Sequence, residues 1–424
     1  MSVVDKGLTK TILKLNVKLR FPDGQKIFCG EVFTASPTPE GKIEGSFRYS
    51  KEYLDHPGAF SLDPENLPLI PHEINTDRAA GVHGVFEDAL PDDWGRKLLA
   101  KKANLSRVEQ TVPNLLKALG SNGLGALAFE SGKTSAYKES SASIHALSEI
   151  VEAALKYDAG LPIDEESLRS LFTCGSSPGG ARPKALIQKE TGSLWIAKIP
   201  KADDKFYVEP IEAGTLQMAR NAGLSVPEFE IQEAGDRKVL LIKRFDVSEQ
   251  GGRYHMISMQ TFLNAEGYYF LSYSHMFNVI QKYSSQTSQD VDAMFRQMVF
   301  NIAVGNTDDH LKNFCMLHKN SGFCLSPVYD VLPDIHQNRE HRLSFPQGSG
   351  SLPIGWELLQ RIGKVYHVSN PGQIIDDVFH AVEDWRDIFR EYEVPESDIQ
   401  KLNHEIQRRI TLIENSGFFD FQKN

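Results

Sequence analysis

The sequence predicts an α+β protein, in which an N-terminal α+β domain precedes a two-lobed module with a strand-rich first lobe and a mostly helical second lobe. Alternating apolar and polar residues, typical of strands, dominate the start of the first region and recur in the second region up to about residue 255, after which helical periodicity prevails. A polar stretch, ESGKTSAYKESSA, separates the two regions. The predicted division is 1–130 for the N-terminal domain, 131–142 for a linker, 143–250 for the strand-rich lobe and 251–424 for the helical lobe.

Composition fits a globular chain of more than one domain. Its 424 residues are 41% hydrophobic and 24% charged, and the formal net charge is -10. Because affinity for DNA phosphates comes largely from Lys and Arg, so acidic a chain is a poor candidate to grip DNA by itself. The apolar runs are too short to cross a membrane, and the N-terminus has no signal-peptide pattern. The four cysteines are scattered without a CxxC pair, which argues against a zinc site and for a reducing cytoplasm.

The elements follow in order along the chain. In the first region, LNVKLRF, KIFCGEVF and EGSFRYS read as strands, and a helix is expected from about Pro91 through Leu99, followed by the short helix in TVPNLLKALG. In the second region the helical pattern IHALSEIVEAALKY leads to a glycine-rich loop. A hairpin of KALIQ and LWIAKIP, a helix at about 208–223 and the strand pair in EFEIQEAGDRKVLLIKRF come next.

Lys198 stands among apolar neighbours in LWIAKIP, so it needs an anion or a route to water. On the helix expected after it, Glu212 lies at the border of the apolar face and should point toward the protein. Taken singly, the two residues suit a lysine that reaches solvent and a half-exposed glutamate. Taken together, they match the strand lysine and helix glutamate that form an ion pair at the nucleotide phosphates of protein kinases.

The segment GNTDDHLKNF follows an apolar helical stripe and is densely polar, which is costly beside a core unless the groups bind something. Asp308 and Asn313 have the offset of the kinase catalytic loop HRDxxxxN, where the Asp accepts the hydrogen bond of the substrate hydroxyl and the Asn binds metal. A simple Asp/Asn turn after a helix would leave the same residues. Asp330 stands at the end of a short apolar strand expected in GFCLSPVYDVLP, and with Asn313 and nucleotide phosphates it would supply ligands for Mg²⁺.

The stretch CGSSPGGARPKALI lies upstream of Lys198, where a loop between two strands would cover phosphates. Glycines let the backbone approach the phosphates and turn its N–H groups toward them. The Walker A pattern is absent, so this is not a P-loop. The order of the features, from glycine-rich loop to lysine, glutamate, Asp/Asn loop and strand-end Asp, is more specific than any one of them.

Together these segments resemble the HipA family of bacterial serine/threonine kinases, the toxins of HipA–HipB toxin–antitoxin pairs. The resemblance rests on SSPGGARPKALI, IAKIP, IEAGTLQMARNAGLSVP, IKRFD, GNTDDHLKNF and SPVYDVLP, and in the first region on FRYSKEYL and FEDALPDDWGRKLL. It covers nearly the whole chain. It implies a bilobal protein-kinase-like fold behind an N-terminal HipA-type domain, with ATP and Mg²⁺ as cofactors.

The resemblance also implies which residues form the site. Asp308 would be catalytic, and Asn313 and Asp330 would bind Mg²⁺. The implied nucleotide-binding residues are Ser177, Gly179, Gly180, Ala181, Arg182, Lys184, Lys198, Glu212, the hinge residues Lys243, Arg244 and Phe245, and His310 and Lys312. In this family a serine at the start of the glycine-rich loop is autophosphorylated, and like-charge repulsion would then eject the loop. The spacing points to Ser177, with the adjacent Ser176 as the alternative.

The family's best-known members phosphorylate an aminoacyl-tRNA synthetase, and their partner is a helix-turn-helix antitoxin of HipB type that binds operator DNA. The resemblance therefore implies a cytoplasmic protein kinase toxin that reaches DNA mainly through its antitoxin and has no membrane partner. Two other interpretations stay open. One is a kinase fold that serves mainly as a co-repressor with little turnover, and the other is a small-molecule kinase of the aminoglycoside or choline type.

Overall fold

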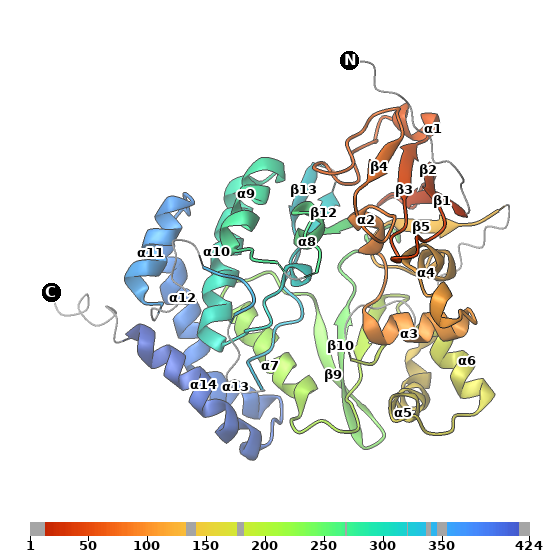
Figure 1. Cartoon of the computed structure of the whole chain (residues 1–424). Helices are drawn as coiled ribbons and strands as arrows, with labels where there is room; N and C mark the ends of the chain where they lie inside the picture. Colours follow the sequence, from red (N-terminus) through yellow and green to blue (C-terminus); the bar gives the residue numbers. More distant parts are fainter. Residues whose placement is uncertain are drawn as a thin grey trace. The chain divides into compact units, whose positions relative to one another are not determined.

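The computed structural model describes residues 13–132, 141–175, 182–267, 269–319, 321–335, 341–345 and 354–414. The chain forms two compact units. The first comprises Met1–Ala197 and Asp246–Glu266, and the second comprises Lys198–Phe245 and Gly267–Asn424. Each unit is thus built from two separate segments of the chain (Figure 1). The domain division that the sequence suggests stays a prediction.

The first unit contains an antiparallel five-stranded sheet in the order β4-β3-β2-β1-β5. Its strands are β1 (Leu13–Arg20), β2 (Lys26–Thr34), β3 (Gly45–Tyr49), β4 (Ile74–Thr76) and β5 (Leu127–Glu130). The alternation seen in the sequence holds, since Leu15, Val17 and Leu19 of β1 are buried. The helices of this part are α1 (Lys51–Leu54), α2 (Gly84–Glu87), α3 (Asp93–Lys102), η1 (Arg107–Glu109) and α4 (Val112–Leu119).

The first unit continues with β6 (Ala142–Ser143), η2 (Ile144–Ala146), α5 (Leu147–Asp158), α6 (Glu165–Cys174), β7 (Lys184–Gln188) and β8 (Leu194–Lys198), of which the last residue, Lys198, belongs to the second unit. Helix α6 was not expected, and it corrects one prediction: the glycine-rich stretch follows a helix rather than a strand. Asp164 caps α6 by accepting a hydrogen bond from the Ser167 backbone N–H, 2.8 Å away. The hairpin of β7 and β8 forms as predicted.

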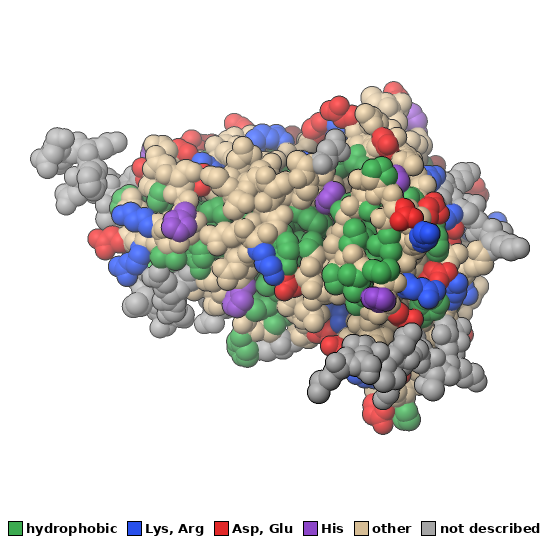
Figure 2. All heavy atoms as spheres, turned by 90° about the horizontal axis from the view of Figure 1, so that it is seen from above, with side chains coloured by type: hydrophobic (Ala, Val, Ile, Leu, Met, Phe, Trp, Pro, Cys, Tyr) green, Lys and Arg blue, Asp and Glu red, His purple; other side chains and the backbone are tan. Residues whose placement is uncertain are grey.

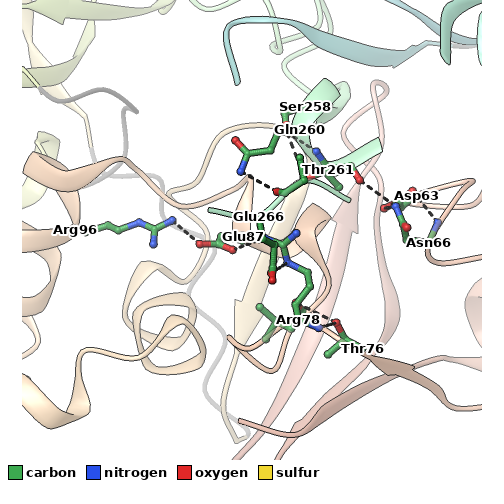
Figure 3. Close-up of polar contacts among 12 residues, drawn as sticks. Asp63, Asn66, Thr76, Arg78, Glu87, Arg96, Ser258, Gln260, Thr261 and Glu266 are labelled. Carbon is green, nitrogen blue, oxygen red and sulfur yellow. Dashed lines mark hydrogen bonds and ion pairs between the residues drawn. The ribbon is translucent and has the colours of Figure 1, made fainter. Parts of the chain in front are cut away.

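A polar network holds the later segment of the first unit, with β11 (His255–Ser258) and α8 (Met259–Phe262), to the earlier one. Figure 3 shows Glu87 between Arg78 and Arg96, each with an Nη2 3.1 Å from a Glu87 carboxylate oxygen. Arg78 also pairs with Glu266 at 2.9 Å. The Asn66 side chain donates to the Thr261 carbonyl, 3.0 Å away. These contacts make one folded unit of segments far apart in sequence.

The second unit is mostly helical. It contains α7 (Val208–Asn221), the hairpin of β9 (Phe229–Ala234) and β10 (Arg237–Lys243), α9 (Tyr273–Tyr283), α10 (Thr287–Val304), η3 (Leu311–Asn313), the hairpin of β12 (Cys315–Lys319) and β13 (Gly322–Leu325), α11 (Trp356–Val365), α12 (Pro371–Glu383), α13 (Trp385–Glu391) and α14 (Glu396–Glu414). Helix α10 contacts α9, α12 and α14 and is buried over most of its length (Figure 1). None of the helices in the described ranges is both long and apolar enough to cross a bilayer.

Candidate functional site

A buried charge cluster forms around Lys198, the last residue of β8. Its Nζ donates hydrogen bonds to the Glu212 carboxylate and to Asp330 Oδ1, the latter at 2.5 Å. Lys198 and Glu212 are only 7% and 5% exposed, whereas two-fifths of the Asp330 side chain is exposed. The three residues lie in the second unit, although Lys198 and Asp330 are 132 residues apart in sequence.

Two opposing effects act on the Lys198 ammonium. Burial alone would lower its pKa, but the charges and hydrogen bonds of Asp330 and Glu212 outweigh burial and raise the pKa above its usual value. Lys198 is therefore held as a cation inside the protein. A buried cation that shares its donors between two carboxylates has a fixed position, which suits a group that meets an anionic ligand.

Helix α7 places Glu212 in this cluster. Val208, Ile211 and Met218 are buried, as the amphipathic pattern predicts, and Glu212 is buried beside them. The Thr215 hydroxyl donates to the Ile211 carbonyl at 2.7 Å, so its polar group is satisfied within the helix. The helix thus turns one carboxylate inward toward Lys198 while its apolar residues pack in the core.

The loop at 305–313 follows the C-terminus of α10. Gly305 ends the helix with φ of 74°, a left-handed conformation that glycine adopts without strain. Asp308 and Asp309 then differ sharply, because the Asp308 side chain is 57% exposed and the Asp309 side chain is fully buried. The Asn313 Nδ2 donates to the Asp308 carbonyl at 2.9 Å. This hydrogen bond ties the two residues of the D-x4-N spacing to one another.

The hairpin of β12 and β13 brings the two halves of the candidate metal site to the same end. Because the strands are antiparallel, the residues before β12 lie beside those after β13. The Ser326 backbone N–H donates to the Cys315 carbonyl at 2.9 Å, and the Tyr329 hydroxyl donates to the Lys312 carbonyl at 2.7 Å. Asp330 comes next, with φ of 55°, a left-handed conformation that Asp tolerates better than most residues.

The fit of this end of the hairpin to Mg²⁺ rests on its donor set. Asn313 and Asp330 provide oxygen atoms, and Mg²⁺ typically takes one or two carboxylates together with phosphate oxygens and water. Within the described residues, no group of three or more His, Cys, Asp or Glu side chains is arranged to hold a metal ion by itself. The oxygen donors of Asn313 and Asp330 therefore fit a Mg²⁺ ion whose other ligands are phosphate oxygens and water.

The predicted hinge residues end β10 and follow it. Lys243 pairs with Glu228 at 2.5 Å and its backbone N–H donates to the Glu228 carbonyl at 2.8 Å. Arg244 is buried, and the Phe245 ring lies 5.5 Å from the Tyr329 ring. The Phe245 contact joins this segment to the residue just before Asp330.

The other predicted site residues are described unevenly. Ser176, Ser177, Gly179, Gly180 and Ala181 lie outside the described residues. Arg182 and Lys184 belong to the first unit, and Lys184 is buried. His310 and Lys312 are half-buried, and the carbonyls of these two residues accept hydrogen bonds from Asn313 N–H and the Tyr329 hydroxyl.

Sequence reasoning missed the residues that support Asp308. Arg342 has its Nε 3.6 Å from Asp308 Oδ1, and Asp309 accepts hydrogen bonds from several groups around it. The neighbouring acids in the motif were a signal that one of them is structural. The partners could not be found in this way because they lie more than thirty residues away, before or after the motif.

On the face shown in Figure 2, basic side chains lie singly or beside acidic ones, with apolar side chains between them. A surface that binds nucleic acid presents a continuous basic area. On this face the described residues form no such area.

Comparisons with known proteins extend over both regions of the chain. Residues 27–130 match the model of the HipA N-terminal domain, and residues 176–386 match that of the HipA-like C-terminal domain. "Putative kinase Y4mE" of Sinorhizobium fredii is 25% identical over 325 residues, which cover 68% of this chain and 72% of that protein. "Toxin YjjJ" of Escherichia coli is 26% identical over 38% of this chain and 39% of that protein.

A solved structure gives the fold. HipA of Shewanella oneidensis, determined with HipB and its operator DNA, superposes with a TM-score of 0.64 and 17% identity over 94% of this chain and 97% of that one. The predicted α+β class with a kinase-like fold is confirmed.

Proposed function

Because this chain belongs to the HipA family, we propose that it is an ATP-dependent serine/threonine protein kinase that acts as the toxin of a toxin–antitoxin pair. The observation that carries the proposal is the convergence of Lys198, Glu212 and Asp330 in one charge cluster. These residues come from β8, α7 and the segment after β13, and nothing in local sequence requires them to meet. A shared ligand explains why a lysine and two carboxylates are kept together at the edge of the core.

Each residue has a role that its geometry supports. Lys198 is a fixed cation for the phosphates of ATP, and Glu212 holds it in place. Asp308 has an exposed carboxylate, which suits a group that accepts the hydrogen bond of an acceptor hydroxyl. Asn313 and Asp330 would hold Mg²⁺. The metal, when bound with ATP, would neutralise charge on the phosphates as the phosphoryl group is transferred.

The finer assignments follow the family. We propose that the residues at 177–184 cover ATP, that Lys243, Arg244 and Phe245 contact the adenine edge, and that His310 and Lys312 line the nucleotide site. We further propose autophosphorylation at Ser177 rather than Ser176. The acceptor would be a serine of a translation component such as an aminoacyl-tRNA synthetase. A helix-turn-helix antitoxin of HipB type would be the partner and would bring the kinase to operator DNA.

The test is transfer of labelled phosphate from ATP to the protein in the presence of Mg²⁺. We expect wild type to autophosphorylate and Asp308→Ala to lose about a hundredfold or more in rate, as positioned acid–base groups do. Asp236→Ala, a change at an exposed acid in the turn between β9 and β10, is the control and should behave as wild type. Mass spectrometry of Ser177→Ala and Ser176→Ala identifies the modified serine.

Other outcomes would favour the alternatives. Equal operator occupancy by wild type and Asp308→Ala with the antitoxin, with no phosphate transfer and no growth effect from either, would indicate a co-repressor. Transfer to an aminoglycoside or to choline, without phosphate on Ser177, would indicate a small-molecule kinase.

A further inference from the structure

Asp309 is a fully buried carboxylate beside the exposed Asp308. Its Oδ2 accepts hydrogen bonds from the Tyr273 hydroxyl at 2.9 Å and from His341 Nδ1 at 3.0 Å. Its Oδ1 accepts from the backbone N–H groups of Arg342 and Leu343, at 2.8 Å and 3.3 Å. Most of these donors belong to one short stretch, so Asp309 joins the 305–313 loop to residues 341–345, which we name the Arg342 segment.

The far side of the His341 ring contacts helix α14. Arg409 Nη1 lies 3.4 Å from His341 Nε2. A guanidinium only donates hydrogen bonds, so Nε2 must accept, and the ring proton must be on Nδ1, facing Asp309. Arg409 is itself 3.5 Å from the Glu405 carboxylate. One tautomer of His341 therefore satisfies both neighbours and connects α14 to the loop.

Other contacts fix the Arg342 segment from its backbone and its end. The Arg342 N–H lies 3.2 Å from the Thr307 carbonyl, and the Ser344 N–H donates to the Leu271 carbonyl at 3.2 Å. The Phe345 ring stacks on Tyr273 with centroids 5.5 Å apart. These contacts hold the backbone of the Arg342 segment, and the Arg342 Nε stands 3.6 Å from Asp308 Oδ1.

The exposed Asp308–Arg342 pair and the buried hydrogen bonds of Asp309 differ in what they contribute to stability. The Asp308–Arg342 pair is exposed on both sides, at 57% and 59%, and such a pair contributes at most about 1 kcal/mol to stability. Asp309, in contrast, is fully buried, and its carboxylate accepts the four hydrogen bonds described above, which satisfy both of its oxygens. The buried network thus lies directly beside an exposed ion pair that contributes little to stability.

We propose that Asp309 and His341 are positioning residues for phosphoryl transfer. They hold the Arg342 segment so that the Arg342 guanidinium faces the Asp308 carboxylate and restricts its orientation. This inference rests on the proposed function, in which Asp308 accepts the hydrogen bond of the acceptor hydroxyl. Neither Asp309 nor His341 touches the reacting atoms, and each acts through the placement of Arg342 and Asp308.

The experiment compares two substitutions of His341 in the full chain. His341→Ala removes both ring contacts, whereas His341→Asn keeps a donor at the position of Nδ1 that can reach Asp309. His380→Ala is the matched control, because His380 is exposed on α12, with its Nδ1 3.7 Å from a Glu383 carboxylate oxygen. Initial rates of autophosphorylation are measured against ATP concentration, and hydrogen exchange is followed at residues 307–313 and 341–345.

We expect His341→Ala to lower kcat by about tenfold or more with the KM for ATP changed less than about twofold, since sub-ångström misplacement acts on the transferring step. His341→Asn should recover most of kcat. Hydrogen exchange should rise in both stretches for His341→Ala and stay at the wild-type level for His380→Ala.

The outcomes separate this inference from the proposed function. If wild type transfers no phosphate, the proposed function fails, and hydrogen exchange still decides whether His341 fixes the Arg342 segment. Unchanged exchange in His341→Ala would overturn the inference. It would also be overturned if His341→Asn were as impaired as His341→Ala, or if kcat and KM worsened only in step with a general loss of stability.

Discussion

Replacing Lys198 by Met should destabilise the second unit far more than replacing Glu212 by Gln. Lys198→Met leaves the buried Glu212 carboxylate without its cation, and breaking a buried pair from one side costs about 3–5 kcal/mol. We expect about 3 kcal/mol, because the Asp330 side chain is 41% exposed and regains water. Glu212→Gln leaves Lys198 paired with Asp330, so a cost of about 1–2 kcal/mol is expected.

The double variant measures the energetic coupling between Lys198 and Glu212. Lys198→Met with Glu212→Gln has no buried charge left without a partner at these two positions. Its loss of stability should therefore fall short of the sum of the single losses by about 1–2 kcal/mol. Lys205→Met, at an exposed lysine just before α7, is the control and should cost less than about 0.5 kcal/mol.

Hydrogen exchange of the α7 amides in increasing urea is the suitable assay, because a whole-chain transition would mix the unfolding of the two units. Equal losses for Lys198→Met and Glu212→Gln, or a Lys198→Met loss below about 1 kcal/mol, would refute the reasoning. The pH gives a second check. Since the folded pKa of Lys198 is raised above its usual 10.5, its stabilisation is fully present below that pH and is lost only as the pH rises through the raised pKa. The stabilisation that the Lys198 charge supplies should thus stay constant across neutral pH.

Three further predictions concern the surroundings of the site and the first unit. Tyr329→Phe removes the hydrogen bond to the Lys312 carbonyl and should cost about 1 kcal/mol of stability. It should also raise the Mg²⁺ concentration needed for half-maximal autophosphorylation. An unchanged Mg²⁺ requirement would count against the proposed metal site at the end of the β12–β13 hairpin. Gly305→Ala places a Cβ 2.7 Å from Arg409 Nε at φ of 74°, so it should cost about 1–3 kcal/mol of stability and raise hydrogen exchange at residues 341–345. Gly235→Ala is the control, because it is also at positive φ but has nothing near its Cβ, and it should leave hydrogen exchange at residues 341–345 unchanged. Burial lowers the pKa of His83 to about 4, so His83 makes the first unit lose up to about 3 kcal/mol as the pH falls from 6.5 toward 4. Asp63, whose pKa burial raises to about 6, acts in the opposite direction, so the measurement is the difference in stability between wild type and His83→Gln. That difference should shift against wild type by up to about 3 kcal/mol between pH 6.5 and pH 4 and stay constant below pH 4.

Local periodicity carried much of the prediction of the fold. The helix expected at about 208–223 is α7, and the hairpin before it and the strand pair after it form where the sequence places them. Apolar spacing works here because each element buries one face regardless of distant partners. Helix α6 was missed even though Asp164 offers an N-cap signal, since its short apolar face lies beside a glycine-rich stretch that reads as a loop.

Some residues of the candidate site could likewise be predicted from the sequence, and others could not. The motif residues Lys198, Glu212 and Asp330 were selected from sequence, and the structure brings them together. The support of Asp308 by His341 and Arg342 was not predictable, because neither residue stands in a recognisable spacing and both are placed by Asp309. Long-range hydrogen bonds to a buried carboxylate leave no periodic trace in sequence.

The charge of the Lys198 cluster sets a condition on the proposed nucleotide site. Lys198 contributes one positive charge, and Glu212 and Asp330 contribute two negative ones, so the cluster is net negative. The phosphates of a nucleotide without bound cations would be repelled by Asp330, the more exposed of the two carboxylates. Binding of ADP should therefore be at least about tenfold weaker in EDTA than in Mg²⁺, and Asp330→Asn should narrow that difference because it removes the repelling charge as well as a metal ligand. Calorimetry that found equal ADP affinity with and without Mg²⁺ would mean that the phosphates do not reach this cluster.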